Sequence, residues 1–349
     1  MPRTLILTKF RELDLSDPFF DSLKAGYQGF SAWFSQKADE DLYIVDDDGK
    51  VSGRSYLKSE EGVVKDVDPP LAAAKWLKVG TLKIEGRGTK LGERVLKKIL
   101  DTAIASGREG IYVTVFELHA DLVRLFERYG FSPYAVKRSA DGVELVLARE
   151  FGKLTGDIVS DYPMIHRDGK AAWLLAVYPE YHTRLLPDSI LNNEPAELVQ
   201  DVSHTNSIHK MYIGKVPLSR MKRGDAVVIY RTSDGKAPAY YRSVATSICV
   251  VEEVRRRNDF SHVDEFLSYT QPHSVFSEAE LRHQFETSNR LYVLKMTYNA
   301  AFEKRTTRGR LIEEANISVQ PKWDLRKLTS EQFDRILDIG GINARIIID

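Results

Sequence analysis

The sequence is short of cysteine, of net charge and of long hydrophobic stretches. Its single cysteine, Cys249, excludes an internal disulfide and a zinc site built from several cysteines. Basic and acidic side chains number 50 each, so binding to nucleic acid through overall charge alone is not expected. No apolar run reaches the roughly 18 residues of a membrane helix, and residues 1–9 lack the basic segment of a secretion signal. We therefore expect a cytoplasmic protein with no membrane partner.

The remaining composition is that of a globular protein. Hydrophobic residues make up 43% of the chain and charged residues 29%, which disfavours disordered and fibrous classes. A length of 349 residues indicates two domains at roughly 100–200 residues each. The eight histidines show no spacing typical of metal ligands, so no metal is expected.

The first half of the chain alternates between strand and helix patterns. Strands are expected at residues 5–10, 42–45, 51–57, 76–84, 110–116 and 143–148. Helices are expected at residues 30–38, 93–106 and 120–129, and Asp17 before Pro18 marks the start of another. Gly107 follows the second of these helices as a helix stop. This alternation ends near residue 152.

The second half of the chain is rich in strands. These are expected at residues 171–177, 210–216, 226–231, 243–254 and 291–296, with helices at 263–269 and 278–285. Thr329 and Gln332 form a capping-box pattern at the start of a last helix. Short strands separated by turns are typical of a small barrel. The expected division is 1–152, a connecting segment 153–202, 203–300 and a C-terminal extension 301–349.

A turn rich in glycine and basic residues joins the strand that ends at Ile84 to the next helix. Free backbone N–H groups and the helix dipole at such a helix start favour a bound phosphate. Gly88 and Gly92 would leave room for a pyrophosphate, and Arg87 would add a cation. An ordinary strand-to-helix turn is the alternative.

The order of elements around this turn resembles the GNAT N-acetyltransferases. The resemblance rests on residues 87–92 between strand and helix, and on the later helix that ends in residues 125–131, and it covers residues 1–150. It implies a mixed central sheet flanked by helices, acetyl-CoA as co-substrate, and direct acetyl transfer to an amine. The residues that it assigns to acetyl-CoA are Leu82, Lys83, Ile84, Arg87, Gly88, Thr89, Lys90, Leu91, Gly92, Glu93 and Phe126.

The resemblance also points to catalytic candidates. The tyrosine that often protonates the departing thiolate falls on Phe126, which cannot donate a proton. Tyr129 or a water could take that role, the thiolate could leave unprotonated, or the enzyme could be slow or inactive. Glu117 and His119 are candidates for the base, with Glu85 as a further option. Surface polar residues at a strand-to-helix junction are the alternative for these side chains.

Residues 203–297 resemble the PUA-like domains, particularly their ASCH and EVE branches. A Gly-Asp turn that leads into an apolar strand, within residues 221–231, and the later strand 246–254 carry this resemblance. It implies binding of RNA or of a single base. The candidate nucleic-acid residues are Arg220, Lys222, Arg223, Tyr230 and Arg231. Solvated charges and half-buried strand tyrosines are the alternative.

Together these features predict an α+β protein in which a GNAT fold precedes a PUA-like small β-barrel domain with helices. The leading expectation is an acetyl-CoA-dependent N-acetyltransferase whose second domain recognises an RNA-linked amine, such as an aminoacyl-tRNA or a base; a toxin is one form of this. A protein or small-amine acetyltransferase, with a second domain that only positions the substrate or forms a homodimer, is an alternative. A catalytically weak RNA-binding module that responds to acetyl-CoA is another.

Overall fold

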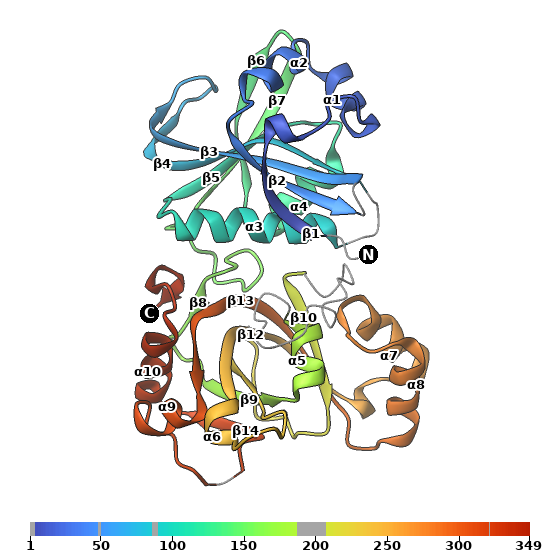
Figure 1. Ribbon diagram of the computed structural model, residues 1–349, viewed down its shortest axis with the longest axis vertical. Coiled ribbons are helices and arrows are strands. Elements are labelled where there is room, and N and C mark those ends of the chain that lie inside the picture. Colours follow the sequence, from blue (N-terminus) through green and yellow to red (C-terminus); the bar gives the residue numbers. More distant parts are fainter. Residues whose placement is uncertain (1–3, 48–49, 86–89, 187–206, 321) are drawn as a thin grey trace. The chain divides into compact units, whose positions relative to one another are not determined.

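The computed structural model describes residues 4–47, 50–85, 90–186, 207–320 and 322–349. Its contacts divide the chain into two compact units, Met1–Asp161 and Tyr162–Asp349, here called unit 1 and unit 2 (Figure 1). Both combine sheets with helices, so the predicted α+β class is confirmed. The finer division at residues 152, 202 and 300 stays a prediction. Within the described part of the chain, no helix is long and apolar enough to cross a membrane.

Unit 1 is built on a seven-stranded mixed sheet with the order β1-β2-β3-β4-β5-β7-β6. Its strands are β1 (Thr4–Lys9), β2 (Asp41–Asp47), β3 (Lys50–Val64), β4 (Leu71–Ile84), β5 (Gly110–Phe116), β6 (Ser132–Ser139) and β7 (Gly142–Glu150). Strands β4 and β5 are parallel because α3 (Leu91–Ala105) carries the chain back between them, whereas the other neighbours are antiparallel.

Helices cover both faces of this sheet. The short helices η1 (Phe10–Glu12), η2 (Pro18–Phe20), α1 (Asp21–Gly26) and α2 (Phe30–Gln36) precede β2, and α4 (Ala120–Arg128) follows β5. Two successive residues of β3 identify the helix on each face of the sheet, because their side chains point in opposite directions. A Cβ added to Gly53 would lie 3.8 Å from Leu91 of α3, whereas Arg54 lies against the Phe34 ring of α2. Thus α2 and α3 pack on opposite faces (Figure 1).

The strands and helices expected in unit 1 are largely confirmed. Strand β5 has the expected bounds, α3 and α4 agree within two residues, and Gly107 has the positive φ of a helix stop. The Asp17 side chain caps η2, where it accepts a hydrogen bond from the Phe19 N–H. Strand β6 was not expected, since it contains a proline and two basic residues and lies at the edge of the sheet.

Unit 2 contains a six-stranded sheet with the order β10-β13-β12-β11-β9-β14. The strands are β9 (Ala172–Val177), β10 (His209–Gly214), β11 (Ala226–Arg231), β12 (Val244–Arg256), β13 (Tyr292–Thr307) and β14 (Leu325–Leu328). Two short strands, β8 (Ile165–His166) and β15 (Ile347–Ile348), form a separate pair. Pairing between the described strands stops at β10 and β14, so the sheet is not closed into the small barrel that strand spacing indicated.

Helices surround the sheet of unit 2. They are α5 (Pro179–Leu185), α6 (Ala239–Arg242), η5 (Arg257–Asp259), α7 (Val263–Thr270), η6 (Gln271–His273), α8 (Glu278–Thr287), α9 (Arg308–Glu313), α10 (Ser330–Gly340) and η7 (Ala344–Ile346). The capping box of Thr329 and Gln332 at the start of α10 is confirmed.

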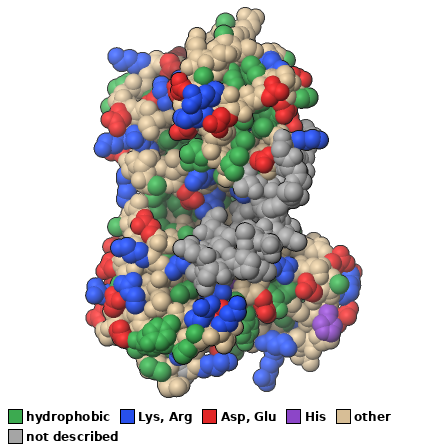
Figure 2. Space-filling view, in the orientation of Figure 1, with side chains coloured by type: hydrophobic (Ala, Val, Ile, Leu, Met, Phe, Trp, Pro, Cys, Tyr) green, Lys and Arg blue, Asp and Glu red, His purple; other side chains and the backbone are tan. Residues whose placement is uncertain are grey.

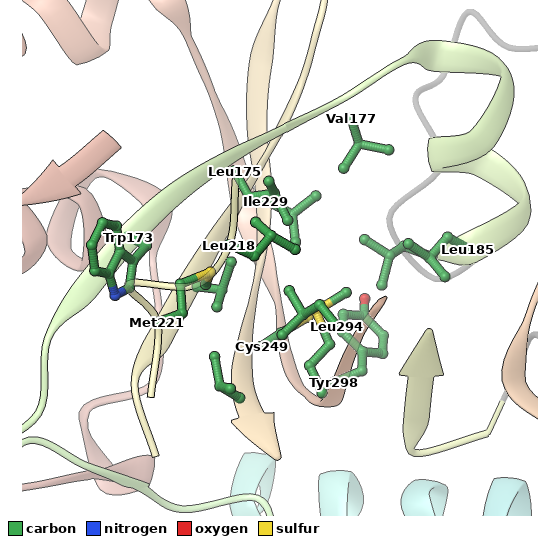
Figure 3. Packing of buried hydrophobic residues seen from close by; sticks show 14 of the residues in the cluster. Trp173, Leu175, Val177, Leu185, Leu218, Met221, Ile229, Cys249, Leu294 and Tyr298 are labelled. Carbon is green, nitrogen blue, oxygen red and sulfur yellow. The ribbon is translucent and has the colours of Figure 1, made fainter. Parts of the chain in front are cut away.

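The core of unit 2 lies between the sheet and α5. Trp173 and Leu175 of β9 pack there with Leu185 of α5 and Tyr298 of β13 (Figure 3). Cys249 of β12 belongs to the same cluster and is fully buried, as its apolar strand predicted.

Candidate active site in unit 1 and ligand cavity in unit 2

The parallel strands β4 and β5 of unit 1 separate partway along their length. They pair only from Trp76 with Gly110 to Val79 with Val113. Beyond this point β4 pairs with β3 alone and β5 with β7 alone, up to Ile84 and Phe116 respectively. Residues 80–84 and 114–116 therefore border an opening in the middle of the sheet.

A β-bulge marks the point where the opening begins. Tyr56 of β3 lies opposite Thr81, but the next residue, Leu57, lies opposite Val79, so Gly80 is an extra residue in β4. A Cβ at Gly80 would lie 2.7 Å from the Tyr56 ring, and only glycine fits there without displacing that ring. Such a bulge redirects the backbone groups of the strand next to a site.

A cavity of about 440 Å³ occupies this opening. Phe30 and Trp33 of α2 line it from one face of the sheet, and Leu122 of α4 lines it from the region beyond the end of β5. Leu82 and Val115 line it from the two separated strands. A ligand in this cavity can therefore contact groups from both strands at the point where they part.

Two carboxylates lie at one side of this cavity. Glu144 of β7 is only 6% exposed, and its side chain accepts a 3.1 Å hydrogen bond from the Tyr27 hydroxyl. Asp141 accepts a 2.7 Å hydrogen bond from the Gln28 N–H. Burial, followed by the charge of Glu144, raises the pKa of Tyr27, so its phenol remains neutral and donates. A buried carboxylate held in this way can take a proton from an amine.

Sequence reasoning missed Glu144. It lies in the apolar segment expected as a strand at residues 143–148, where one acidic residue usually marks the solvent-facing side. A signal was nevertheless present, since a charged residue among apolar neighbours needs a partner if it is buried. The partner, Tyr27, is 117 residues away in the sequence.

Four lysines also line this cavity. They are Lys37, Lys58, Lys78 and Lys137. Lys78 of β4 lies 3.7 Å from Asp66 and 4.0 Å from Glu60, while Lys58 and Lys137 pair with the same two carboxylates at 2.9 and 2.6 Å. Burial, and then the nearby charge of Lys137, lowers the pKa of Lys78. These lysines can attract an anionic group.

The start of α3 is described from Lys90 onward. Arg87, Gly88 and Thr89, three of the residues predicted to bind acetyl-CoA, lie outside the described residues. The space beside Gly92 is taken by Leu125 of α4, which an added Cβ would approach to 2.9 Å, so this glycine permits close helix packing.

Leu91 and Glu93 are both buried in the first turn of α3. The Glu93 carboxylate lies 3.8 Å from Lys90 and 3.4 Å from Arg128 of α4. These two cations therefore lie beside the helix start. Sequence reasoning missed Arg128, which is 35 residues from Glu93 along the chain.

The predicted residues of β4 have different surroundings. Leu82 lines the cavity, whereas Lys83 pairs with Glu85 at 2.7 Å and donates a hydrogen bond to the Phe19 carbonyl group. Lys83 thus ties η2 to β4. Ile84, the last residue of β4, is half-buried.

The predicted catalytic residues are not brought together. Glu117 is exposed in the turn after β5, whereas His119 precedes α4 and lines the cavity. Tyr129 ends α4 and is fully buried, and Phe126 is fully buried with its ring 4.8 Å from that of Phe131. Of these four residues, His119 is the one that lines the described cavity.

Unit 2 contains a larger cavity of about 880 Å³. Several aromatic residues line it: Tyr178, Tyr181, Tyr212, Tyr230, Phe276 and Trp323. The Tyr230 hydroxyl is buried and makes no hydrogen bond of normal geometry with the described residues. The Tyr230 ring lies 5.1 Å from the Trp323 ring. The guanidinium group of Arg308 lies 4.5 Å from the centre of the same Trp323 ring. Flat aromatic faces beside this buried hydroxyl, with Ser243 and Arg308 near it, are suited to a planar ligand with hydrogen-bonding groups.

The five predicted nucleic-acid residues fall into two groups. Arg220, Lys222 and Arg223 are exposed before the start of β11. Tyr230 and Arg231 are buried at its other end. The strand between them spans about 20 Å, so the five side chains do not form a single site. Basic and acidic side chains are mixed on the face of unit 2 shown in Figure 2.

No family model and no curated protein matches this chain. Among solved structures it is similar to an ASCH protein from Zymomonas mobilis, at 14% identity and a TM-score of 0.33, over 48% of this chain and 94% of that one. It is also similar to a putative phosphinothricin N-acetyltransferase, at 21% identity and a TM-score of 0.32, over 42% of this chain and 98% of that one. A third similar structure is the IAA acetyltransferase from Bacillus cereus ATCC 14579, at 14% identity and a TM-score of 0.31, over 42% of this chain and 99% of that one. The solved structures to which the chain is similar thus include an ASCH protein and two acetyltransferases.

Proposed function

We propose that unit 1 is an acetyl-CoA-dependent N-acetyltransferase. The observation that carries this proposal is the cavity at the point where β4 and β5 part after Val79 and Val113. An acyl group and an amine must meet in a confined space for direct transfer, and this opening provides one that side chains from both separated strands reach.

The described residues fit a CoA thioester at this opening. Backbone groups of β4 at residues 80–84 have no partner strand on the side of β5, so they can bind the amides of an extended pantetheine arm. The start of α3, with Lys90 and Arg128 beside it, is suited to a pyrophosphate. When bound, acetyl-CoA supplies an activated acyl group, so the protein has only to position the amine and remove its proton.

The side chains of the cavity supply that remaining chemistry. Glu144 accepts a proton from the incoming ammonium group, and the neutral Tyr27 phenol holds the carboxylate in place. Phe30 and Trp33 form a wall that excludes water from the amine. Glu144 therefore replaces Glu117 as the preferred base, and His119, which also lines the cavity, is retained as the second candidate.

No side chain of α4 is needed as a proton donor in this proposal. Phe126 cannot donate, and Tyr129 is fully buried and does not line the described cavity. The thiolate would then leave unprotonated or take its proton from water. Without a proton donor for the thiolate, we expect turnover to be slow.

Unit 2 is proposed to bind the part of the substrate that is not acetylated. The aromatic cavity around Tyr230 and Trp323 suits a single base, and Arg308 next to Trp323 suits a phosphate. These features support an RNA-linked acceptor such as an aminoacyl-tRNA.

Labelled acetyl-CoA tests the proposal when it is offered three acceptor pools: RNA with charged tRNA, total protein, and small amines. Label that enters RNA and is lost on deacylation supports the RNA-linked acceptor. Label in small amines or protein supports the transferase activity but removes the proposed role of unit 2. Absence of label in every pool contradicts the transferase.

A further inference from the structure

Arg54 of β3 is a buried cation surrounded by aromatic rings. Its side chain is fully buried, and its guanidinium carbon lies between 5.2 and 5.7 Å from five ring centres. The rings belong to Phe10, Phe20, Phe30, Trp33 and Phe34. None of its three nitrogen atoms has a hydrogen-bond partner among the described residues. Burial lowers the pKa of Arg54 to about 9, so it still carries its charge at neutral pH.

This charge lies directly behind a wall of the unit 1 cavity. Phe30 and Trp33, two of the five rings, also line that cavity. Aromatic faces attract a cation but replace its hydration only in part, and a buried charge is ordinarily balanced by an opposite one. The field of Arg54 is therefore available to an anion in the cavity.

Three lysines that line the same cavity add further positive charge. Lys58, Lys78 and Lys137 share only two carboxylates, Glu60 and Asp66, at distances between 2.6 and 4.0 Å. One lysine charge thus stays unbalanced by the described residues. Together with Arg54 this makes two surplus positive charges.

Negative charge is in excess at two carboxylates of the same cavity. Glu144 and Asp141 form no ion pair with the described residues; their hydrogen-bond donors are the Tyr27 hydroxyl and the Gln28 N–H. Lys137 lies opposite Glu144 in the sheet, but its ammonium group lies 2.6 Å from Asp66. The cavity therefore has surplus positive charge near Glu60 and Asp66 and surplus negative charge at Glu144 and Asp141.

We propose that the acceptor of unit 1 is a zwitterion, an amine that also carries a carboxylate or phosphate group. Its ammonium group binds at Glu144 and Asp141, its acid group binds at Lys58 and Lys78, and Arg54, behind Phe30 and Trp33, adds to the positive field of the cavity. This inference rests on the proposed transferase function and names the chemical class of its acceptor, to which an aminoacyl-tRNA belongs because several bonds link its amine to its nearest phosphate group.

The sheet also indicates how far apart the two groups of the acceptor lie. Lys78 is opposite Tyr112, and Glu144 is opposite Phe116, four residues farther along β5. The backbone positions of Lys78 and Glu144 are therefore about 13 Å apart along the strand direction. The long lysine side chains shorten the gap, so an acceptor with several bonds between amine and acid fits better than an α-amino acid.

Matched acceptor pairs test the proposal. One pair is 6-aminohexanoate and its amide, and the other is O-phosphoethanolamine and ethanolamine, so that the carboxylate and phosphate sources are measured separately. We expect the wild-type KM for at least one acid to be tenfold or more below that of its neutral partner. Arg54→Met and Lys78→Met should each raise the KM for that acid about tenfold, while the KM of the neutral partner changes less than threefold.

Two further measurements distinguish failure of this inference from failure of the proposed transferase function. Lys9→Met is the matched control, because Lys9 pairs with Asp41 outside the cavity, and it should keep the wild-type preference. Calorimetric titration of each acceptor without acetyl-CoA reports binding even if no transfer occurs. Acid binding that Arg54→Met weakens supports the inference although the transferase has failed. Equal affinity for acid and neutral partners, or a preference that both variants keep, overturns it.

Discussion

Val79 of β4 lies opposite Val113 of β5, and this is the last pair that the two parallel strands make. Both strands continue beyond it, bound only to their outer neighbours. The sheet of unit 1 is therefore continuous on one side of this pair and open on the other. The cavity, the bulge at Gly80 and the buried Glu144 all lie around that opening.

Filling the opening should block the binding of CoA. Leu82→Trp places a large ring on β4 beyond the last pair, where Leu82 lines the cavity and is half-buried. We expect affinity for CoA to fall at least tenfold in a calorimetric titration, with the melting temperature nearly unchanged. Leu7→Trp, on the exposed side of edge strand β1, is the control and should bind CoA normally. Equal affinity in both variants would place the donor elsewhere.

Removing the Glu144 carboxylate should slow the reaction without unfolding the protein. Glu144→Gln keeps the size of the side chain but loses the proton acceptor, so kcat/KM should fall about 10²–10⁴-fold. The KM for the amine should change less than kcat, which a purely structural role would not cause. Tyr27→Phe retains the carboxylate and should cost much less. A Glu144→Gln enzyme with a normal kcat would return the role of base to His119 or Glu117.

The Tyr230 hydroxyl should matter for ligand binding rather than for stability. It is buried without a hydrogen bond of normal geometry to the described residues, so Tyr230→Phe should leave the free energy of unfolding unchanged or raise it by about 1 kcal/mol. Loss of one hydrogen bond to a bound base should weaken RNA binding about tenfold. Filter binding and thermal denaturation measure the two effects. A less stable protein with unchanged RNA affinity would assign the hydroxyl a structural role.

Buried His182 should make unit 2 sensitive to acid. Burial, and then Arg231 and Arg305, lowers its pKa from 6.5 to about 3. Between these values the unfolded chain binds a proton that the folded chain does not, so the free energy of unfolding falls as pH decreases from about 6.5 to 3. The slope is about 1.4 kcal/mol per pH unit.

Urea denaturation of wild type and His182→Gln at several pH values measures this contribution. Glutamine can retain the hydrogen bond that His182 makes with Thr246 at 2.8 Å. The stability of wild type relative to the variant should decrease as the solution is made acidic. Parallel pH curves would mean that His182 titrates alike in both states.

Local patterns were enough to predict many elements but not the groups that make the site. Strand β5 follows from a run of β-branched and aromatic residues, and the start of α10 follows from the Thr329 capping box, because both depend on neighbours in the sequence. Arg54 stands within a correctly predicted strand, yet its ring of aromatic side chains comes from residues 10–34. Such convergence depends on tertiary packing, which spacing does not encode.

The same reason explains the outcome for the predicted site residues. Leu82 and His119, two residues that the resemblance singled out, both line the cavity, and their predicted roles stay predictions. The resemblance could not distinguish exposed Glu117 from buried Glu144, since that difference depends on how β7 is covered by the Tyr27 region. In unit 2, Arg223 and Tyr230 are close in sequence but are separated by the length of β11.

Hydrogen exchange of the β4 backbone tests the central claim most directly. Amides of residues 80–84 on the side of the opening have no partner strand and should exchange readily in the free protein. Added acetyl-CoA should slow exchange there and at the start of α3, while the paired residues Trp76–Val79 change little. Unchanged exchange at residues 80–84 in a protein saturated with acetyl-CoA would contradict the claim that this opening holds the donor.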